Sequence, residues 1–281
     1  MNKKTDLTGT SKGYKIFSVI ILVAMVLFFL FPLYWIVTGS FKDRIEITAR
    51  EPIWFPMDPT VENYAKLFDN PAFLWLFNII FISAAAMVLT CITASLAGYA
   101  LGKKRFIGRG VLFTIIICAM ALPKQVIVIP LAQLMTFLHL KDTLWAVILP
   151  TVGWPFGVFL MKQFSENVPT EMLEAARIDG AGQWRTFAQI VFPLIKPGVG
   201  ALAIFTFITS WNDYFMQLIM LISRANQTIS VGIALMQSGP DANDFGLIMA
   251  GAAVAAVPIL AVFIMFQRYF TQGITMGAVK G

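Results

Sequence analysis

The sequence predicts an all-α, polytopic membrane protein with six transmembrane helices, and both its composition and its apolar stretches lead to that prediction. Of the 281 residues, 58% are hydrophobic and only 13% are charged, whereas soluble domains carry about 25% charged residues. The mean hydropathy is +0.76. These values exclude a water-soluble globular protein. The formal charge of +6 is then typical of basic residues that flank membrane spans, and it does not indicate a nucleic-acid partner.

Six apolar stretches are long enough to cross a bilayer core of about 30 Å, which needs roughly 20 residues of helix. They are residues 16–37, 77–101, 111–138, 143–161, 199–222 and 245–266. The first exceeds the core of a cleavable signal peptide, so we expect it to be retained. The third contains Pro123, Lys124 and Pro130, and is either one broken span or a shorter span followed by a surface piece.

The distribution of basic residues predicts that both termini are cytoplasmic, because cytoplasmic segments carry the excess of Lys and Arg. With the amino terminus inside, fourteen of the 21 basic residues fall on the cytoplasmic side. The predicted organisation is a cytoplasmic tail over residues 1–15, a transmembrane domain over 16–267 and a cytoplasmic tail over 268–281. Three connections are long: outer loops over 38–76 and 223–244, and a cytoplasmic loop over 162–198. A short amphipathic helix is expected near 61–68.

Catalytic and metal sites have little support in the sequence. His139 is the single histidine, and Cys91 and Cys118 both lie in apolar stretches. These residues provide neither a disulfide framework nor a set of metal ligands, and they form no Ser-His-Asp arrangement. No nucleotide-binding P-loop occurs either. We therefore expect no enzymatic activity, no metal site and no cofactor bound by this chain.

The cytoplasmic loop is predicted to contain two helices separated by a glycine. Thr170 is expected to cap the first helix, and Gly180 to end it in a left-handed conformation. The second helix is expected over residues 183–192, before Pro193. From periodicity alone, an interfacial helix pair on the bilayer surface is as good an interpretation as a docking element.

The spacing of residues in this loop resembles the EAA loop of bacterial ABC importer permeases. The sequence has Glu174-Ala175-Ala176, three residues, Gly180, nine residues, Ile190, one residue, and Phe192-Pro193, with phenylalanine where leucine is usual. The resemblance implies the MetI-like permease fold, with a coupling helix that docks on a separate ATP-hydrolysing subunit. The contact residues that it implies are Glu171, Glu174, Ala175, Ala176, Asp179 and Gly180.

Shorter motifs in the same order make the chain similar to the MalG-like subunit of maltose-type sugar importers. They are Phe31-Pro32-Leu33 with Trp35, Asn63-Tyr64, residues 97–100, Pro123 with Gln125, Trp211-Asn212-Asp213, Gln267-Arg268 and residues 277–281. The resemblance implies a permease subunit of a sugar importer in a bacterial-type cell membrane. It also implies a second, MalF-like permease, an ATPase dimer that holds ATP and Mg, an external sugar-binding protein, a sugar or oligosaccharide substrate, and surrounding lipid.

Two further contact regions follow from this resemblance. The carboxyl-terminal residues Val279, Lys280 and Gly281 are expected at the interface between the ATPase subunits. In the outer loop, Gln227, Gln237 and Ser238 are expected to contact the sugar-binding protein.

Ionisable side chains inside apolar spans are costly and indicate a transport path or a paired site. Lys124 and Asp213 are the candidates, together with Gln125, Trp211 and Asn212. Two alternatives stay open: Lys124 snorkels to the outer interface, or Asn212 and Asp213 bond to neighbouring helices.

Pairs of glycines at four-residue spacing predict close helix packing: Gly98 with Gly102, and Gly153 with Gly157.

The alternative function is a carrier driven by an ion gradient, which predicts inverted repeats and paired acidic residues within the spans.

Overall fold

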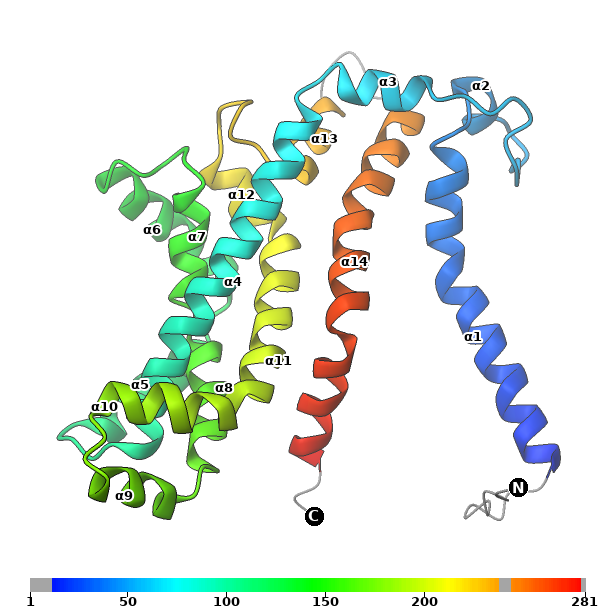
Figure 1. Cartoon of the computed structure of the whole chain (residues 1–281). Helices are drawn as coiled ribbons and strands as arrows, with labels where there is room; N and C mark the ends of the chain where they lie inside the picture. The colour runs from blue at the N-terminus through cyan, green and yellow to red at the C-terminus, as the bar shows by residue number, and fades with distance from the viewer. Residues whose placement is uncertain (1–11, 238–243, 279–281) are drawn as a thin grey trace. The chain divides into compact units, whose positions relative to one another are not determined.

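The computed structural model describes the backbone of residues 12–237 and 244–278, and the side chains of 13–237 and 244–266. Across the described residues the secondary structure is helical, without a strand, as predicted (Figure 1). The elements are α1 (Lys12–Gly39), α2 (Arg44–Ile47), α3 (Glu62–Phe68), α4 (Ala72–Lys103), α5 (Arg109–Met120), α6 (Lys124–Phe137), α7 (Trp145–Val152), α8 (Pro155–Glu166), α9 (Thr170–Ile178), α10 (Gln183–Thr186), the π-helix η1 (Phe187–Val191), α11 (Phe192–Trp211), α12 (Tyr214–Met220), α13 (Ile229–Met236) and α14 (Phe245–Ala278).

Within the described part of the chain, five helical segments are long and apolar enough to cross a membrane, and a sixth is obtained if the bent pair α5 and α6 counts as one span. The bend between these two helices is 107°. α5 has 12 residues, which rise about 18 Å and so fall short of a bilayer core. Pro123 precedes α6 and cannot donate to the preceding turn. The predicted third stretch is therefore broken.

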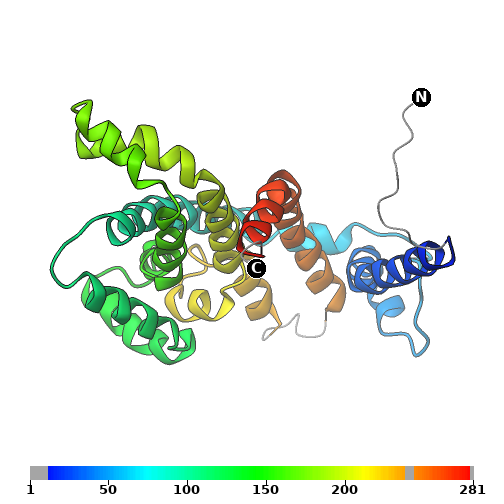
Figure 2. The same ribbon diagram turned by 90° about the horizontal axis from the view of Figure 1, so that it is seen from below.

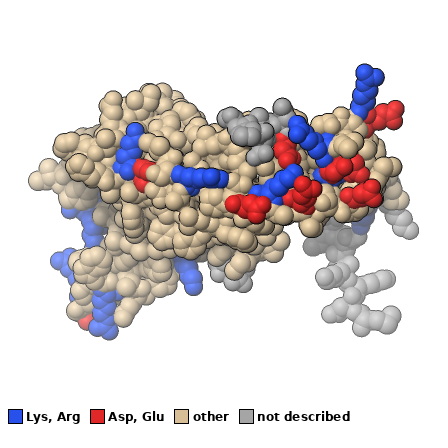
Figure 3. All heavy atoms as spheres, turned by 90° about the horizontal axis from the view of Figure 1, so that it is seen from above, with Lys and Arg blue, Asp and Glu red and all other residues tan. Residues whose placement is uncertain are grey.

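Two compact units make up the chain: residues 1–69 with 241–254, and residues 70–240 with 255–281. In the first unit the predicted short helix is present as α3. Its buried Asn63 donates hydrogen bonds to the carbonyls of Ser40 (3.0 Å) and Lys42 (2.8 Å). The Lys42 ammonium lies 4.5 Å from the centre of the Trp35 ring. Acidic and basic side chains gather over α2 and α3, as Figure 3 shows.

The second unit is built on α4, α8 and α11, which pack side by side (Figure 2). A Cβ atom on Gly98 would lie 2.6 Å from backbone atoms of Met161 and Lys162, so only glycine allows α4 and α8 to approach this closely. Around Gly157, the nearest atoms belong to Ala94 and Thr90 of α4. The predicted close packing is confirmed at these glycines. Gly153 has only carbonyls of its own helix nearby.

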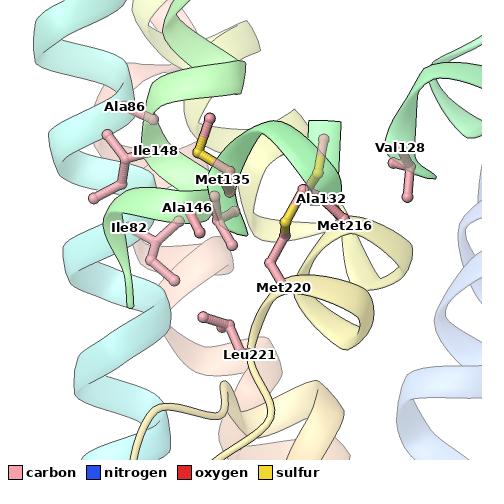
Figure 4. Packing of buried hydrophobic residues seen from close by; sticks show 11 residues of the cluster. Ile82, Ala86, Val128, Ala132, Met135, Ala146, Ile148, Met216, Met220 and Leu221 are labelled. Carbon is pink, nitrogen blue, oxygen red and sulfur yellow. The ribbon is translucent and has the colours of Figure 1, made fainter. Parts of the chain in front are cut away.

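A second packed region joins α4, α6, α7 and α12 near the other end of this unit. Its buried side chains include Ile82, Ile148 and Met220 (Figure 4). Because α6 contributes Val128, Ala132 and Met135 to this cluster, the short helix after the bend is anchored in the protein core.

The fifth predicted span differs from the structure at both ends. Its helix continues from α10 and η1 and ends at Trp211, whereas residues 214–220 form the separate helix α12. Asp213 lies at this break, where its carboxylate accepts a hydrogen bond from the Met216 N–H (3.4 Å) and caps α12. Two smaller differences concern boundaries: α4 begins at Ala72, inside the predicted outer loop, and α14 continues beyond residue 267 to Ala278.

Candidate functional site

The α9 loop, defined here as residues 167–186, joins α8 to α10 at one end of the second unit (Figure 1). Gly180 has φ +73° and ends α9 as predicted. Two backbone hydrogen bonds complete the turn: Ala181 N–H to the Ala176 carbonyl (2.9 Å), and Gly180 N–H to the Arg177 carbonyl (3.2 Å). This pair of bonds is the Schellman motif, which fixes the direction in which the chain leaves a helix.

Two local predictions for this loop are wrong. Thr170 does not cap α9, because the cap position is Pro169, which makes no side-chain hydrogen bond. The second helix does not stop at Pro193, since the π-helix η1 connects α10 to α11 without a break. A π-turn changes the hydrogen-bond register, so it accommodates a following proline that lacks an N–H.

The predicted contact residues of the α9 loop are mostly exposed. Glu171, Glu174, Ala175, Asp179 and Gly180 all face outward, whereas Ala176 is 5% exposed. Ala176 therefore packs against the chain itself.

Two large apolar side chains that are not among the predicted contact residues lie in the same loop, and one of them belongs to the apolar side that the sequence predicts for the second helix. Ile178 is 86% exposed and Trp184 is 74% exposed. Exposed apolar groups between carboxylates are typical of a surface that a partner covers. Their position in the sequence beside the EAA residues is the signal by which they could have been identified as contact residues.

The base of the α9 loop is fixed by a charged cluster around Glu166, the last residue of α8. The Glu166 carboxylate pairs with Lys162 (2.7 Å) and with Arg109 (3.7 Å). Its carbonyl accepts a hydrogen bond from Lys103 (3.1 Å). On the other side of the loop, Lys104 bonds to the Gln183 side chain. Basic residues of the α4–α5 turn thus hold both ends of the loop.

The predicted path residues Lys124 and Asp213 form an ion pair, with 3.4 Å between the Lys124 Nζ and the Asp213 Oδ2. The same ammonium lies 4.9 Å from the centre of the Trp154 ring, a contact that the sequence did not indicate. Two cavities of about 290 and 300 Å³ share Lys124 and Asp213 as lining residues. The ammonium is thus held between an acid and an aromatic face, facing open space.

The remaining predicted path residues divide into two groups. Gln125 and Asn212 line the same cavity of about 300 Å³ as the ion pair. Trp211 is 4% exposed and its ring stacks on Phe207, with 5.7 Å between ring centres. Its indole is therefore part of helix packing, and Trp154 is the aromatic residue that faces the ion pair.

The α12–α13 loop, defined here as residues 221–228, is held by hydrogen bonds from other elements. Asn78 donates to the carbonyls of Ala225 (2.9 Å) and Gln227 (2.8 Å). The Trp75 indole N–H donates to the Arg224 carbonyl (2.7 Å). Gln227, a predicted contact with a binding protein, is 7% exposed and serves this internal network.

Asp142, in the turn between α6 and α7, fixes the start of the same loop. Its carboxylate accepts hydrogen bonds from the N–H groups of Ile222 and Ser223, both at 2.8 Å, and from the Ser223 hydroxyl. Burial raises the pKa of Asp142, but these hydrogen bonds together outweigh burial and leave the pKa below its ordinary value.

Five further residues are predicted to contact a partner, and the structure describes one of them, Gln237. Gln237 is exposed directly after α13. Ser238 and residues 279–281, which are Val279, Lys280 and Gly281, lie outside the described residues. Among the side chains that the structure describes, no group of three His, Cys, Asp or Glu residues is placed to hold a metal ion.

Comparison with known proteins gives a consistent result. The family model described as "Binding-protein-dependent transport system inner membrane component" matches residues 94–276. The arabinooligosaccharides transport system permease protein AraQ of Bacillus subtilis is 34% identical, over 95% of this chain and 96% of the relative. The maltodextrin transport system permease protein MdxG of the same organism is 32% identical, over 95% and 96%.

A solved structure has the same fold. It is a chain of a bacterial ABC transporter involved in the import of the acidic polysaccharide alginate, with a TM-score of 0.78 and 23% sequence identity. The match covers 93% of this chain and 99% of that chain.

Proposed function

The chain belongs to the family of inner membrane components of binding-protein-dependent transport systems, and from this premise we propose that it is one of two permease subunits of an ATP-driven sugar importer. The names of its relatives support an oligosaccharide as the substrate, because they transport arabinooligosaccharides and maltodextrin. The other partners are a second permease, an ATPase dimer that holds ATP and Mg, and an external sugar-binding protein. In this assembly the chain itself has no catalytic role and binds no cofactor.

The single observation that carries the coupling role is the exposed surface of the α9 loop. Glu171, Glu174 and Asp179 lie in the same loop as Ile178 and Trp184, and all five side chains are exposed. Carboxylates at the edge of an apolar surface suit a partner groove that has cationic walls. Because the loop is fixed to the α4–α5 turn, a movement of the ATPase on this surface would displace α4 and α8 together.

The basic residues support a cytoplasmic position for the α9 loop. Lys103, Lys104, Arg105 and Arg109 lie at its end of the second unit, beside Lys162. An excess of Lys and Arg is typical of cytoplasmic segments. Both termini are then cytoplasmic, and residues 279–281 are proposed to reach the ATPase interface.

The sugar path is proposed to follow the cavities around Lys124 and Asp213, with Gln125 and Asn212 as hydrogen-bonding groups. Asp213 is the carboxylate that a gradient-driven carrier would need for proton or ion binding. It is instead paired with Lys124 and caps α12, so the structure does not favour that alternative.

Affinity purification of the chain from its native cells in mild detergent tests the proposal. We expect a second permease and an ATPase to co-purify, and the ATPase to be lost from a double variant, Glu174→Arg with Gly180→Pro. Gly182→Ala is the control, because φ at Gly182 is −68° and a Cβ there meets no atom within 4 Å. A chain that purifies alone would overturn the proposal. Uptake of labelled arabinotriose and maltotriose, with and without the chain, then identifies the sugar.

A further inference from the structure

The α4–α5 turn, residues 103–109, is a basic surface at the end of the second unit that carries the α9 loop (Figure 1). The sequence has no acidic residue from position 70 to position 141. Among the described residues, Glu166 is the one carboxylate paired with a cation of this turn, and it also pairs with Lys162 of α8. The cations of the turn are Lys103, Lys104, Arg105 and Arg109. Most of their positive charge is therefore not balanced within the chain.

The middle of the α4–α5 turn presents a cation beside apolar side chains. Ile107 is fully exposed, and the neighbouring Phe106 is exposed as well. Arg105 is exposed and makes no hydrogen bond or ion pair with any residue that the structure describes. Gly108, with φ +84°, turns the chain into α5 directly after Ile107. Apolar side chains next to Lys and Arg are typical of segments that bind the surface of a membrane.

The helices on either side place the α4–α5 turn at the level of the lipid headgroups. α4 is an apolar span that ends at Lys103. α5 is apolar and has no buried residue, and Val111 and Leu112 in its first turn are exposed. Because α5 exposes apolar side chains from its first turn onward, it faces the acyl chains of the membrane. The turn that precedes it then lies where the acyl chains meet the headgroups.

Hydrogen bonds to neutral acceptors hold the cations in place without cancelling their charge. Lys103 donates to the Glu166 carbonyl (3.1 Å), and Lys104 donates to the Gln183 side chain. The Arg109 guanidinium donates to the Lys104 carbonyl (3.3 Å). A phosphate group supplies the missing negative charge and accepts charge-assisted hydrogen bonds from such donors. Each Lys or Arg beside an anionic membrane surface strengthens binding about fivefold.

We propose that the α4–α5 turn binds an anionic phospholipid. Arg105 contacts the lipid phosphate, Lys103 and Lys104 add positive charge beside it, and Ile107 enters the boundary of the acyl chains. The ATPase is the other partner proposed at this end, but the α9 loop that it covers carries exposed carboxylates, whereas the α4–α5 turn is wholly basic and leads into the exposed apolar α5.

The inference goes beyond the proposed function, because this site lies outside the sugar path. A lipid held here also anchors the base of the α9 loop, since Lys103 and Lys104 bond to both ends of that loop.

Quenching by spin-labelled lipids tests the site. In a Cys91→Ala, Cys118→Ala background, Ile107→Cys is labelled with a nitrobenzoxadiazole fluorophore, and the chain is placed in nanodiscs with the subunits that co-purify with it. All discs hold the same mixture of phosphatidylglycerol and phosphatidylcholine. The quenching nitroxide is attached to the acyl chain of one lipid or of an equal amount of the other. We expect position 107 to prefer phosphatidylglycerol about tenfold in relative affinity, and the preference to fall as salt is added.

Ile178→Cys is the matched control, because Ile178 is also exposed at this end of the unit but lies in the α9 loop. At position 178 the two lipids should quench equally. Equal quenching at position 107 would overturn the inference. Loss of quenching at position 107 when the ATPase is added would overturn it as well, because the α4–α5 turn would then belong to the ATPase interface.

A charge variant of the Ile107→Cys chain supplies an independent readout. Arg105→Gln should lower the preference for phosphatidylglycerol about fivefold, and it should fold normally because Arg105 has no partner among the described residues. Arg177→Gln removes the same charge from the exposed end of α9 and should leave the preference unchanged. An unchanged preference in Arg105→Gln would contradict the proposed contact. The preference is measured without sugar, so a failure to import sugar would remove the proposed function and leave this inference standing.

Discussion

The α9 loop and the α12–α13 loop belong to the same unit, yet they use their polar groups in opposite ways. In the α9 loop, Glu174 and Trp184 point away from the protein. In the α12–α13 loop, the carbonyl of the buried Gln227 accepts a hydrogen bond from Asn78 of α4, and the Asn226 side chain donates one to the Asp142 carbonyl in the α6–α7 turn. The first loop therefore offers its side chains to a partner, whereas the second uses them to keep its own shape.

This difference separates two kinds of functional surface. A docking element that must accept force needs a free face and a fixed base, which the α9 loop has through Glu166 and Gln183. A loop with an internally fixed backbone presents a preformed shape, so it binds a partner at a lower entropic cost.

The largest expected effect is the loss of ATPase binding on truncation of Trp184. Because Trp184 is 74% exposed, Trp184→Ala should leave the stability of the chain unchanged. A tryptophan at the centre of an interface contributes about 2 kcal/mol, so affinity for the ATPase should fall about 30-fold. The affinity of the solubilised permease pair for the ATPase measures this, with the exposed Gln189→Ala as the control. Unchanged affinity would remove Trp184 from the docking surface.

The second prediction concerns a variant that should lose stability while it retains its affinity for the ATPase. Asn78→Ala removes two hydrogen bonds and leaves the part-buried carbonyl of Ala225 and the buried carbonyl of Gln227 without this donor. We expect a loss of about 2 kcal/mol of stability, or about 4 to 8 °C in melting temperature, with ATPase binding retained. Thermal unfolding in detergent measures this. Asn167→Ala is the control, since Asn167 is exposed and its side-chain hydrogen bond, to the Gln163 carbonyl (3.1 Å), lies within one helical turn at the surface. If Asn78→Ala melts like the control, the α12–α13 loop is not fixed in the way described.

The same contrast explains what the sequence could and could not predict. The apolar spans, the end of α9 at Gly180 and the exposed EAA residues depend on local hydropathy, on the position of a glycine and on residue spacing. They can therefore be predicted from a single sequence. The burial of Gln227 depends on Asn78, and the pairing of Lys124 with Asp213 depends on the 107° bend. Trp154 likewise acquires its surroundings from helices distant in sequence. Such contacts require the fold.

Acid pH should weaken the α12–α13 loop through Asp142. Its pKa is lowered in the folded protein, while the unfolded value is about 3.9. The ionised carboxylate therefore contributes stability above pH 4, and this contribution is lost as pH falls through the folded pKa. Asp142→Asn should reduce the melting temperature at pH 7, by less than Asn78→Ala because the carboxamide oxygen still accepts. The difference from the wild type should shrink as pH falls through the folded pKa. A difference that is constant with pH would contradict this account.

The smallest expected effect concerns the direction of the chain at the end of α9. At Gly180, φ is +73° and a Cβ would meet no atom within 4 Å, so Gly180→Ala adds backbone strain without a clash. The cost is about 1 kcal/mol. Gly182→Ala adds the same methyl group where φ is −68°, and should be neutral or slightly stabilising. Hydrogen exchange of the Ala181 amide, which bonds to Ala176, distinguishes the variants. Faster exchange in Gly180→Ala alone is expected, because only that change strains the Schellman turn that positions Trp184 relative to Glu174. Equal exchange in both variants would mean that the free face of the α9 loop does not depend on this turn.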